Sequence, residues 1–145
     1  NTDVIVGFPG ETHEQFEKTL RLVRQMRFDV VHIAAYSPRP GTSAARWKDD
    51  VAPQEKARRR ALVEQVQTRI ATEINATQLG QEVEILVDGH QRGRWRGRTR
   101  TNKLVFFESE DDWLGRMARV RITWTGPWSM VGQVAAPLSW DDDPK

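Results

Sequence analysis

The feature that most constrains the fold is a single strand, helix and strand pattern at the start of the chain. Residues 3–8 are an apolar, β-branched run typical of a buried parallel strand, and residues 29–36 are a second one. Between them, Thr12 and Gln15 predict the capping box of a helix. The expected apolar stripe of that helix is Phe16, Leu20, Val23 and Met26. Such a βαβ unit requires a parallel sheet, and because the pattern does not recur, we expect the rest of that sheet to be supplied from elsewhere.

The stretch after this unit predicts a loop and then a long connecting helix. Residues 37–53 are rich in proline and glycine and would leave the C-terminal end of the second strand, where parallel α/β sheets bind ligands. Residues 53–80 have helical periodicity, with Gly80 placed to end the helix. The expected apolar stripe is Leu62, Val66, Ile70 and Ile74. The charged faces, which include Arg58, Arg59 and Arg60, are interpreted as solvated rather than as nucleic-acid contacts.

The spacing of apolar residues changes from helical to alternating after Gly80. Alternation with glycine at the turns predicts short antiparallel strands. The expected strands are residues 82–87, 92–100, 104–107, 119–124 and 129–134, with turns at Asp88–Gly89 and Gly126–Pro127. Residues 81–136 therefore predict a small, closed or nearly closed antiparallel β-barrel of the oligonucleotide-binding type. Residues 137–145 are expected to form a disordered acidic tail.

Arginine occupies every second position between residues 92 and 100. If extended, this segment places five guanidinium groups along one side of a strand. They belong to Arg92, Arg94, Arg96, Arg98 and Arg100. Such a row repels itself unless an anion lies along it, and the phosphates of a nucleic acid suit guanidinium groups well. Polar groups suited to phosphate and ribose follow at Thr99, Thr101, Asn102 and Lys103.

A second interpretation of the arginine row stays open, because arginines also protect an edge strand against aggregation. The density of arginine in a chain whose net charge is only +2 favours nucleic-acid binding. Four aromatic residues are suited to stack on bases, although most of them are expected in the core of so small a barrel. They are Phe106, Phe107, Trp124 and Trp128.

The residue types that carry most catalytic and metal chemistry are absent or isolated. The sequence has no cysteine, which excludes disulfides, thiol catalysis and cysteine-bound clusters within these residues. No histidine shares a metal-binding spacing with a carboxylate, and no spacing matches Asp3, Glu11 or Asp49–Asp50 with a nucleophile or a base. We therefore expect no catalytic and no metal-binding residue. Without an apolar run long enough for a bilayer or a signal pattern, we expect a cytoplasmic location and no membrane partner.

Three segments, in this order, resemble the radical SAM methylthiotransferases that modify tRNA. They are TDVIVGFPGET (2–12), YSPRPGTSAA (36–45) and GRTRTNKLVFF (97–107). The segments are most similar to those of members that act on isopentenylated adenosine beside the anticodon. The resemblance implies that residues 1–52 are the late βα units of a partial TIM-type barrel and that residues 53–80 are a connecting helix. It also implies that residues 81–136 are a TRAM domain, a small β-barrel that binds the RNA substrate.

The same resemblance implies cofactors that this chain would share rather than hold alone. The family uses S-adenosylmethionine and two 4Fe-4S clusters. Ile5 and Gly7 match the strand that lines the adenine of S-adenosylmethionine, and Tyr36 and Ser37 match the end of the neighbouring strand. The cluster-binding cysteines of the family have no counterpart, so this chain alone is expected to hold no cofactor and to start no radical chemistry.

The function implied is that of the C-terminal part of a tRNA methylthiotransferase, which adds a methylthio group to C2 of the isopentenylated adenosine. Residues 39–42 and 97–103 favour tRNA over the ribosomal protein that other members modify. The expected partners are tRNA and the missing N-terminal portion of the same enzyme. Two alternatives remain: a stand-alone nucleic-acid-binding module, and the protein-docking domain of a related methylthiotransferase.

Overall fold

The computed structural model describes residues 1–137, which form two compact units. The first unit spans Asn1–Ala71 and the second begins at Thr72. The acidic tail expected over residues 137–145 lies outside the described residues, except for Pro137, which ends the last strand. Among the helices of residues 1–137, none is both long and apolar enough to cross a bilayer.

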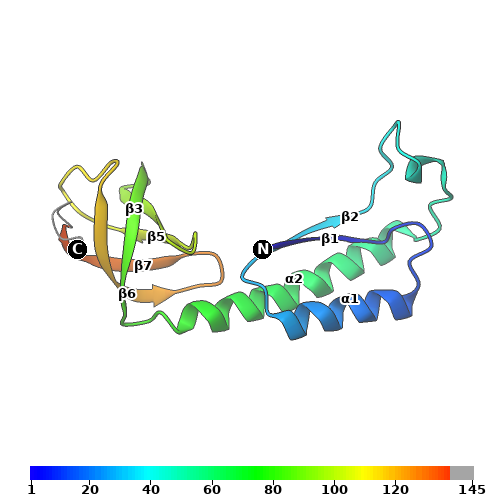
Figure 1. The fold of residues 1–145 in the computed structure, drawn as a ribbon, viewed down its shortest axis with the longest axis horizontal. Coiled ribbons are helices and arrows are strands. Elements are labelled where there is room, and N and C mark those ends of the chain that lie inside the picture. The colour runs from blue at the N-terminus through cyan, green and yellow to red at the C-terminus, as the bar shows by residue number, and fades with distance from the viewer. Residues whose placement is uncertain (138–145) are drawn as a thin grey trace, which may run out of the picture. The chain divides into compact units, whose positions relative to one another are not determined.

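The first unit contains the expected βαβ arrangement (Figure 1). Strands β1 (Thr2–Val6) and β2 (Val31–Ala35) pair in parallel, with Thr2 opposite Val31 and Val6 opposite Ala35. Helix α1 (His13–Met26) connects them. A short 3-10 helix, η1 (Ala44–Arg46), lies within the loop that leads to α2 (Pro53–Ala76). This confirms the parallel pair predicted from the two apolar runs.

Helix α1 begins with the capping box that the sequence predicts. The Thr12 hydroxyl accepts a hydrogen bond from the Gln15 backbone N–H, and the Gln15 side chain accepts one from the Thr12 N–H. Phe16, Leu20 and Val23 are buried as expected. The expectation for Met26 is wrong, since 56% of it is exposed. At 100° per residue, Met26 lies about a quarter of a turn away from the line of the three buried side chains.

The two strands of the first unit are not buried on both faces, contrary to the expectation. Val6 and Val31 are buried on the face that α1 and α2 cover (Figure 1). Ile5, which alternates with Val6, is 57% exposed, and His32 and Ala34 are exposed on β2. The reason is that both helices of this unit cover the same face of a two-stranded sheet.

Helix α2 ends at Ala76, and a turn carries the chain to Gly80, which has a φ of 78°. The buried side of α2 differs from the expected stripe. Only Ile70 of that stripe is buried, and Leu62, Val66 and Ile74 are half-buried. The buried positions of this helix include four polar residues. They are Lys56, Arg59, Gln67 and Asn75.

The second unit is a closed five-stranded barrel, which confirms the small β-barrel predicted after Gly80. Its strands are β3 (Glu82–Gln91), β4 (Arg94–Thr99), β5 (Leu104–Phe107), β6 (Met117–Thr125) and β7 (Met130–Pro137). Their order around the barrel is β3-β4-β5-β7-β6. Every neighbouring pair is antiparallel except β5 and β7, which run parallel. The core includes Ile85, Val105, Phe107, Val120 and Ile122.

The turn predicted at Asp88–Gly89 is wrong. Strand β3 continues through these residues with an irregularity between Val87 and Gly89, and the chain reverses at Arg92 and Gly93. A bulge takes up one extra residue without ending a strand, so a short Asp-Gly signal fits either outcome. Within β4, Gly97 faces the barrel interior, where a Cβ would lie 2.7 Å from the Leu86 carbonyl oxygen. This close approach of β4 to β3 therefore requires glycine.

Candidate functional site

The predicted arginine row is shorter as a strand than the sequence suggests. Arg94, Arg96 and Arg98 lie along β4, alternating with Trp95, Gly97 and Thr99, which are half-buried or buried. Arg92 has a φ of 53° and lies in the turn before β4, and Arg100 lies in the turn after it. The row thus consists of three arginines on a strand and one in each flanking turn.

Carboxylates of the same unit pair with this row, which corrects the expectation that it needs an external anion. Four contacts connect the row to three acidic residues: Arg94 to Glu108 at 2.9 Å, Arg96 to Asp88 at 2.8 Å, Arg98 to Asp88 at 3.5 Å, and Arg100 to Glu84 at 3.0 Å. The pairs are solvent-exposed, so each stabilises the fold by less than about 1 kcal/mol.

One arginine of the row and two others of the barrel unit are exposed and have no side-chain partner among residues 1–137. They are Arg92, Arg116 and Arg119. Arg119 lies on β6 directly opposite Glu84 of β3. The barrel therefore carries both paired and unpaired guanidinium groups on its surface.

The polar residues predicted after the row form the tight turn between β4 and β5. The Thr99 hydroxyl accepts a hydrogen bond of 3.0 Å from the Lys103 N–H, and Asn102 has a φ of 64°. The Lys103 ammonium donates to Asn75 Oδ1 at 2.9 Å. Thr101 and Asn102 are exposed, and Asn102 Oδ1 accepts from Arg98 at 3.3 Å. Thr99 and Lys103 thus shape the turn, and Thr101 and Asn102 are its accessible side chains.

The four aromatic candidates divide between the core and the surface. Phe107 is fully buried and packs edge-on against Trp113, and Phe106 is half-buried. Trp124 is 53% exposed and Trp128 is 58% exposed. Core packing therefore accounts for Phe107, and the two tryptophans are available to a ligand.

Three of the four residues predicted to contact a cofactor lie together in the first unit. Ile5, Tyr36 and Ser37 line a pocket of about 320 Å³, together with residues that include Phe8 and Arg39. Gly7 is not part of this pocket. It packs instead against Lys56 of α2, where a Cβ on Gly7 would overlap the Lys56 side chain. The pocket therefore lies at the C-terminal ends of β1 and β2, as a ligand site of a parallel sheet does.

The walls of this pocket suit a flat, apolar group. The Phe8 ring packs edge-on against Tyr36 at 5.0 Å and against Trp47 at 5.7 Å. The Tyr36 hydroxyl donates to the Ala44 carbonyl at 3.0 Å, so its polar end is already bonded within the protein.

Within residues 1–137, no group of three metal-binding side chains is present.

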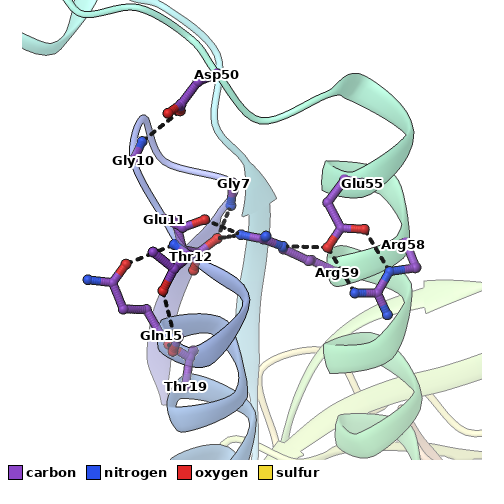
Figure 2. Close-up of polar contacts among 10 residues, drawn as sticks. All are labelled: Gly7, Gly10, Glu11, Thr12, Gln15, Thr19, Asp50, Glu55, Arg58 and Arg59. Atoms are coloured by element: carbon purple, nitrogen blue, oxygen red, sulfur yellow. Dashed lines mark hydrogen bonds and ion pairs between the residues drawn. The ribbon is translucent and has the colours of Figure 1, made fainter.

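A buried ionic cluster shapes the turn between β1 and α1, as Figure 2 shows. Arg59 Nη1 contacts Glu11 Oε2 at 2.6 Å and the Glu11 carbonyl oxygen at 2.9 Å. The same Glu11 carboxylate oxygen accepts a hydrogen bond from the Gly7 N–H, and Asp50 accepts one from the Gly10 N–H. The exposed fraction of the side chain is 6% for Arg59 and 13% for Glu11. This cluster holds the backbone that leads from β1 to Phe8, one of the pocket residues.

Arg59 also completes an ion pair in the first turn of α2. Hydrogen bonds from Arg58 and Arg59 lower the pKa of Glu55 to about 2. Glu55 therefore stays ionised well below the pH at which a free glutamate is protonated. Arg58 and Arg60 are exposed, which agrees with the predicted solvated face, but the interpretation is wrong for Arg59.

Lys56 connects the loop after β2 to α2. Its ammonium contacts Asp49 Oδ2, donates to the Tyr36 carbonyl at 3.3 Å, and lies 5.2 Å from the centre of the Tyr36 ring. Sequence reasoning missed both Lys56 and Arg59, because isolated cations on a helix are usually solvated. They lie seven and four residues before Val63, which is fully buried, and so share its side of the helix; because the expected stripe did not include Val63, no local signal in the sequence identified them.

Comparison with known proteins identifies the barrel of the second unit and finds relatives of the whole chain. Residues 76–135 match the family model of the TRAM domain. The chain is 58% identical over 138 residues to the tRNA-2-methylthio-N(6)-dimethylallyladenosine synthase of Roseiflexus sp. (strain RS-1), a match that covers 92% of this chain and 29% of that protein. The synthase of Herpetosiphon aurantiacus is 53% identical over 138 residues, covering 92% and 32%.

The synthase of Chloroflexus aurantiacus is 51% identical over 135 residues, covering 90% of this chain and 29% of that protein. The chain thus spans about a third of the length of the curated relatives it matches. Identity at this level over nine-tenths of the chain extends well beyond the TRAM domain into the first unit. Residues 76–135 therefore form a TRAM domain, and the chain as a whole resembles the C-terminal region of tRNA-2-methylthio-N(6)-dimethylallyladenosine synthases.

Proposed function

We propose that this chain is the tRNA-binding part of a methylthiotransferase that adds a methylthio group to C2 of isopentenylated adenosine beside the anticodon. The names of the relatives supply the substrate, and the exposed arginines of a TRAM domain supply the observation that carries the proposal. Residues 81–136 would bind the RNA, residues 53–80 would connect, and residues 1–52 would complete the wall of a TIM-type barrel. Because its substrate would be tRNA, we expect the enzyme to act in the cytoplasm.

The pairing of the arginine row with carboxylates is compatible with this role. A guanidinium group has five N–H donors, and Arg94 and Arg96 each use the Nε–H with their carboxylate. No hydrogen bond within residues 1–137 uses their remaining donors, which could bind phosphate oxygens. The carboxylates also restrict the two arginine side chains before RNA binds, which lowers the entropic cost of binding.

The pocket of the first unit supports a place for S-adenosylmethionine in the complete enzyme. Ile5 and Tyr36 would flank its adenine, Ser37 would lie at the rim, and the Gly7 backbone would hold the adjoining turn in place. This cofactor supplies the radical chemistry when it is bound together with an iron–sulfur cluster. The present chain has no cysteine, so both 4Fe-4S clusters would be held by another part of the enzyme.

A salt titration with tRNA tests the proposal. We expect the logarithm of the binding constant to fall linearly with the logarithm of salt concentration. Joint replacement of Arg94, Arg96, Arg98 and Arg100 by alanine should weaken binding and reduce the slope by about one for each phosphate that is no longer bound. Arg60→Ala on α2 is the matched control and should leave the slope unchanged. Absence of binding, or binding without salt dependence, would reject the RNA-binding role.

A further inference from the structure

Two turns lie side by side at one end of the barrel. Strands β5 and β7 are parallel neighbours, with Val105 opposite Met130. The turn of residues 100–103 precedes β5, and the turn of residues 126–129 precedes β7. Because parallel neighbours start at the same edge of a sheet, the two turns emerge together.

Asn75, at the end of α2, connects these turns. It is buried, and its amide nitrogen donates to the carbonyl oxygens of Gly126 at 2.8 Å and Pro127 at 3.2 Å. Its side-chain oxygen accepts from the Lys103 ammonium at 2.9 Å. One side chain therefore fixes both turns and holds a cation beside the Gly126 backbone.

The indole of Trp124 packs over Gly126. A Cβ at Gly126 would overlap Trp124 Cη2 and lie 3.0 Å from Cζ3, so only glycine permits this position of the ring. The residue is nevertheless 53% exposed, and Trp128 in the same turn is 58% exposed. The backbone supports the Trp124 ring on one side and leaves the rest of it accessible to solvent.

Cations and a hydroxyl accompany these rings at the same end of the barrel. The Arg100 side chain is 83% exposed, Thr101 is exposed, and Lys103 lies two hydrogen bonds away from Gly126 through Asn75. Indole rings and cations at one end of a barrel match single-stranded RNA, in which unpaired bases stack on aromatic rings and phosphates lie alongside. A hydrophobic protein partner would not use the adjacent positive charge in this way.

We propose that Trp124, assisted by Trp128, is a stacking platform for an unpaired RNA base, and that the turn of residues 100–103 binds the adjoining phosphate. This inference rests on the proposed RNA-binding function and specifies where an unpaired part of the RNA is bound. It distinguishes two types of contact on the same barrel. The arginine row binds backbone charge, and the indoles bind the face of a base.

The test measures the affinity of the full chain for a short single-stranded oligoadenylate, for the same backbone without bases, and for a fully paired RNA duplex. Trp124→Ala should weaken binding of the oligoadenylate about 5-fold to 100-fold and leave its salt slope unchanged. Trp124→Phe should keep most of the affinity. Arg100→Ala should instead reduce the salt slope by about one. Trp124→Ala and the unaltered chain should have equal affinity for the base-free strand, and equal affinity for the duplex.

Leu114→Ala is the matched control, because Leu114 is 62% exposed in another loop of the barrel, and it should not change oligoadenylate binding. Thermal unfolding of Trp124→Ala close to that of the unaltered chain excludes misfolding as the cause. If the unaltered chain binds RNA with a salt slope but Trp124→Ala binds oligoadenylate equally tightly, the stacking platform is wrong and the RNA-binding function stands. If the unaltered chain binds none of the three RNAs, both proposals fail.

Discussion

Arg59 shows how a single charged side chain organises the first unit. It is almost completely buried, and it bonds Glu11 of the β1–α1 turn and Glu55 of its own helix. Its guanidinium group also lies 5.4 Å from the centre of the Phe16 ring. Glu11 also accepts a hydrogen bond from the Gly7 N–H. Without Arg59, the buried Glu11 carboxylate would keep that hydrogen bond but lose the positive charge that offsets its desolvation.

Replacement of Arg59 by alanine is expected to lower the free energy of unfolding of the first unit by about 3 kcal/mol, the low end for breaking a buried ion pair. Arg60→Ala is the neighbouring control. Its side chain is 53% exposed and pairs with Glu64, so it should cost less than about 1 kcal/mol. Urea denaturation, followed by a probe in the first unit, measures both. Equal effects of the two substitutions would show that burial of Arg59 does not stabilise the unit.

At the scale of elements, the first turn of α2 forms ion pairs, and Asn75 in its last turn forms hydrogen bonds with two turns of the barrel. Glu55 in the first turn pairs with Arg58 and Arg59, and its pKa falls to about 2. A carboxyl group whose pKa is lowered by folding stabilises the folded state at pH values above its unfolded pKa. That stabilisation disappears as the pH falls from about 4.5, the ordinary value for glutamate, to about 2.

The difference in stability between the unaltered chain and Glu55→Gln should follow this pH window. We expect the unaltered chain to be more stable from about pH 5 to about pH 7, by an amount that does not change over that range. The difference should shrink steadily below about pH 4.5 and vanish near pH 2. Thermal unfolding of both proteins across this range measures it. A difference that grows as the pH falls would contradict the sign of the pKa change.

At the scale of the molecule, the two units differ in whether every strand has a hydrogen-bonded neighbour on both sides. The barrel is closed, so each of its strands has a neighbour on both sides. The sheet of the first unit has two strands, and the outward face includes the exposed Ile5. Strand edges and apolar surface of this kind open more readily than a closed barrel does.

Hydrogen exchange is therefore expected to be faster in β1 and β2 than in the barrel core. Amides of Val4 and Ile33 should exchange sooner than those of Val105 and Val120, which are fully buried positions of paired strands. Mass spectrometry of peptides from the isolated chain measures this. Uniform protection across both units would contradict it and would show that the two-stranded sheet is as stable as the closed barrel.

Local sequence alone determined the elements whose signals lie within a few residues. The Thr12–Gln15 capping box, the alternation of Val120 and Ile122 with exposed neighbours, and the turn at Gly126–Pro127 were all confirmed. Three motifs in order also pointed to the relatives that the comparison found. These signals succeed because a cap, a strand period or a motif depends on neighbouring residues and not on distant contacts.

Tertiary structure alone decided which polar and aromatic side chains are buried. Arg59 and Arg60 are adjacent in sequence, yet only Arg59 meets the Glu11 carboxylate, 48 residues away. Phe107 fills the barrel while Trp124 remains exposed over Gly126, and the arginine row finds its carboxylates on other strands and loops. Periodicity defines the faces of an element, but burial depends on what packs against each face, and that is settled only when the elements assemble.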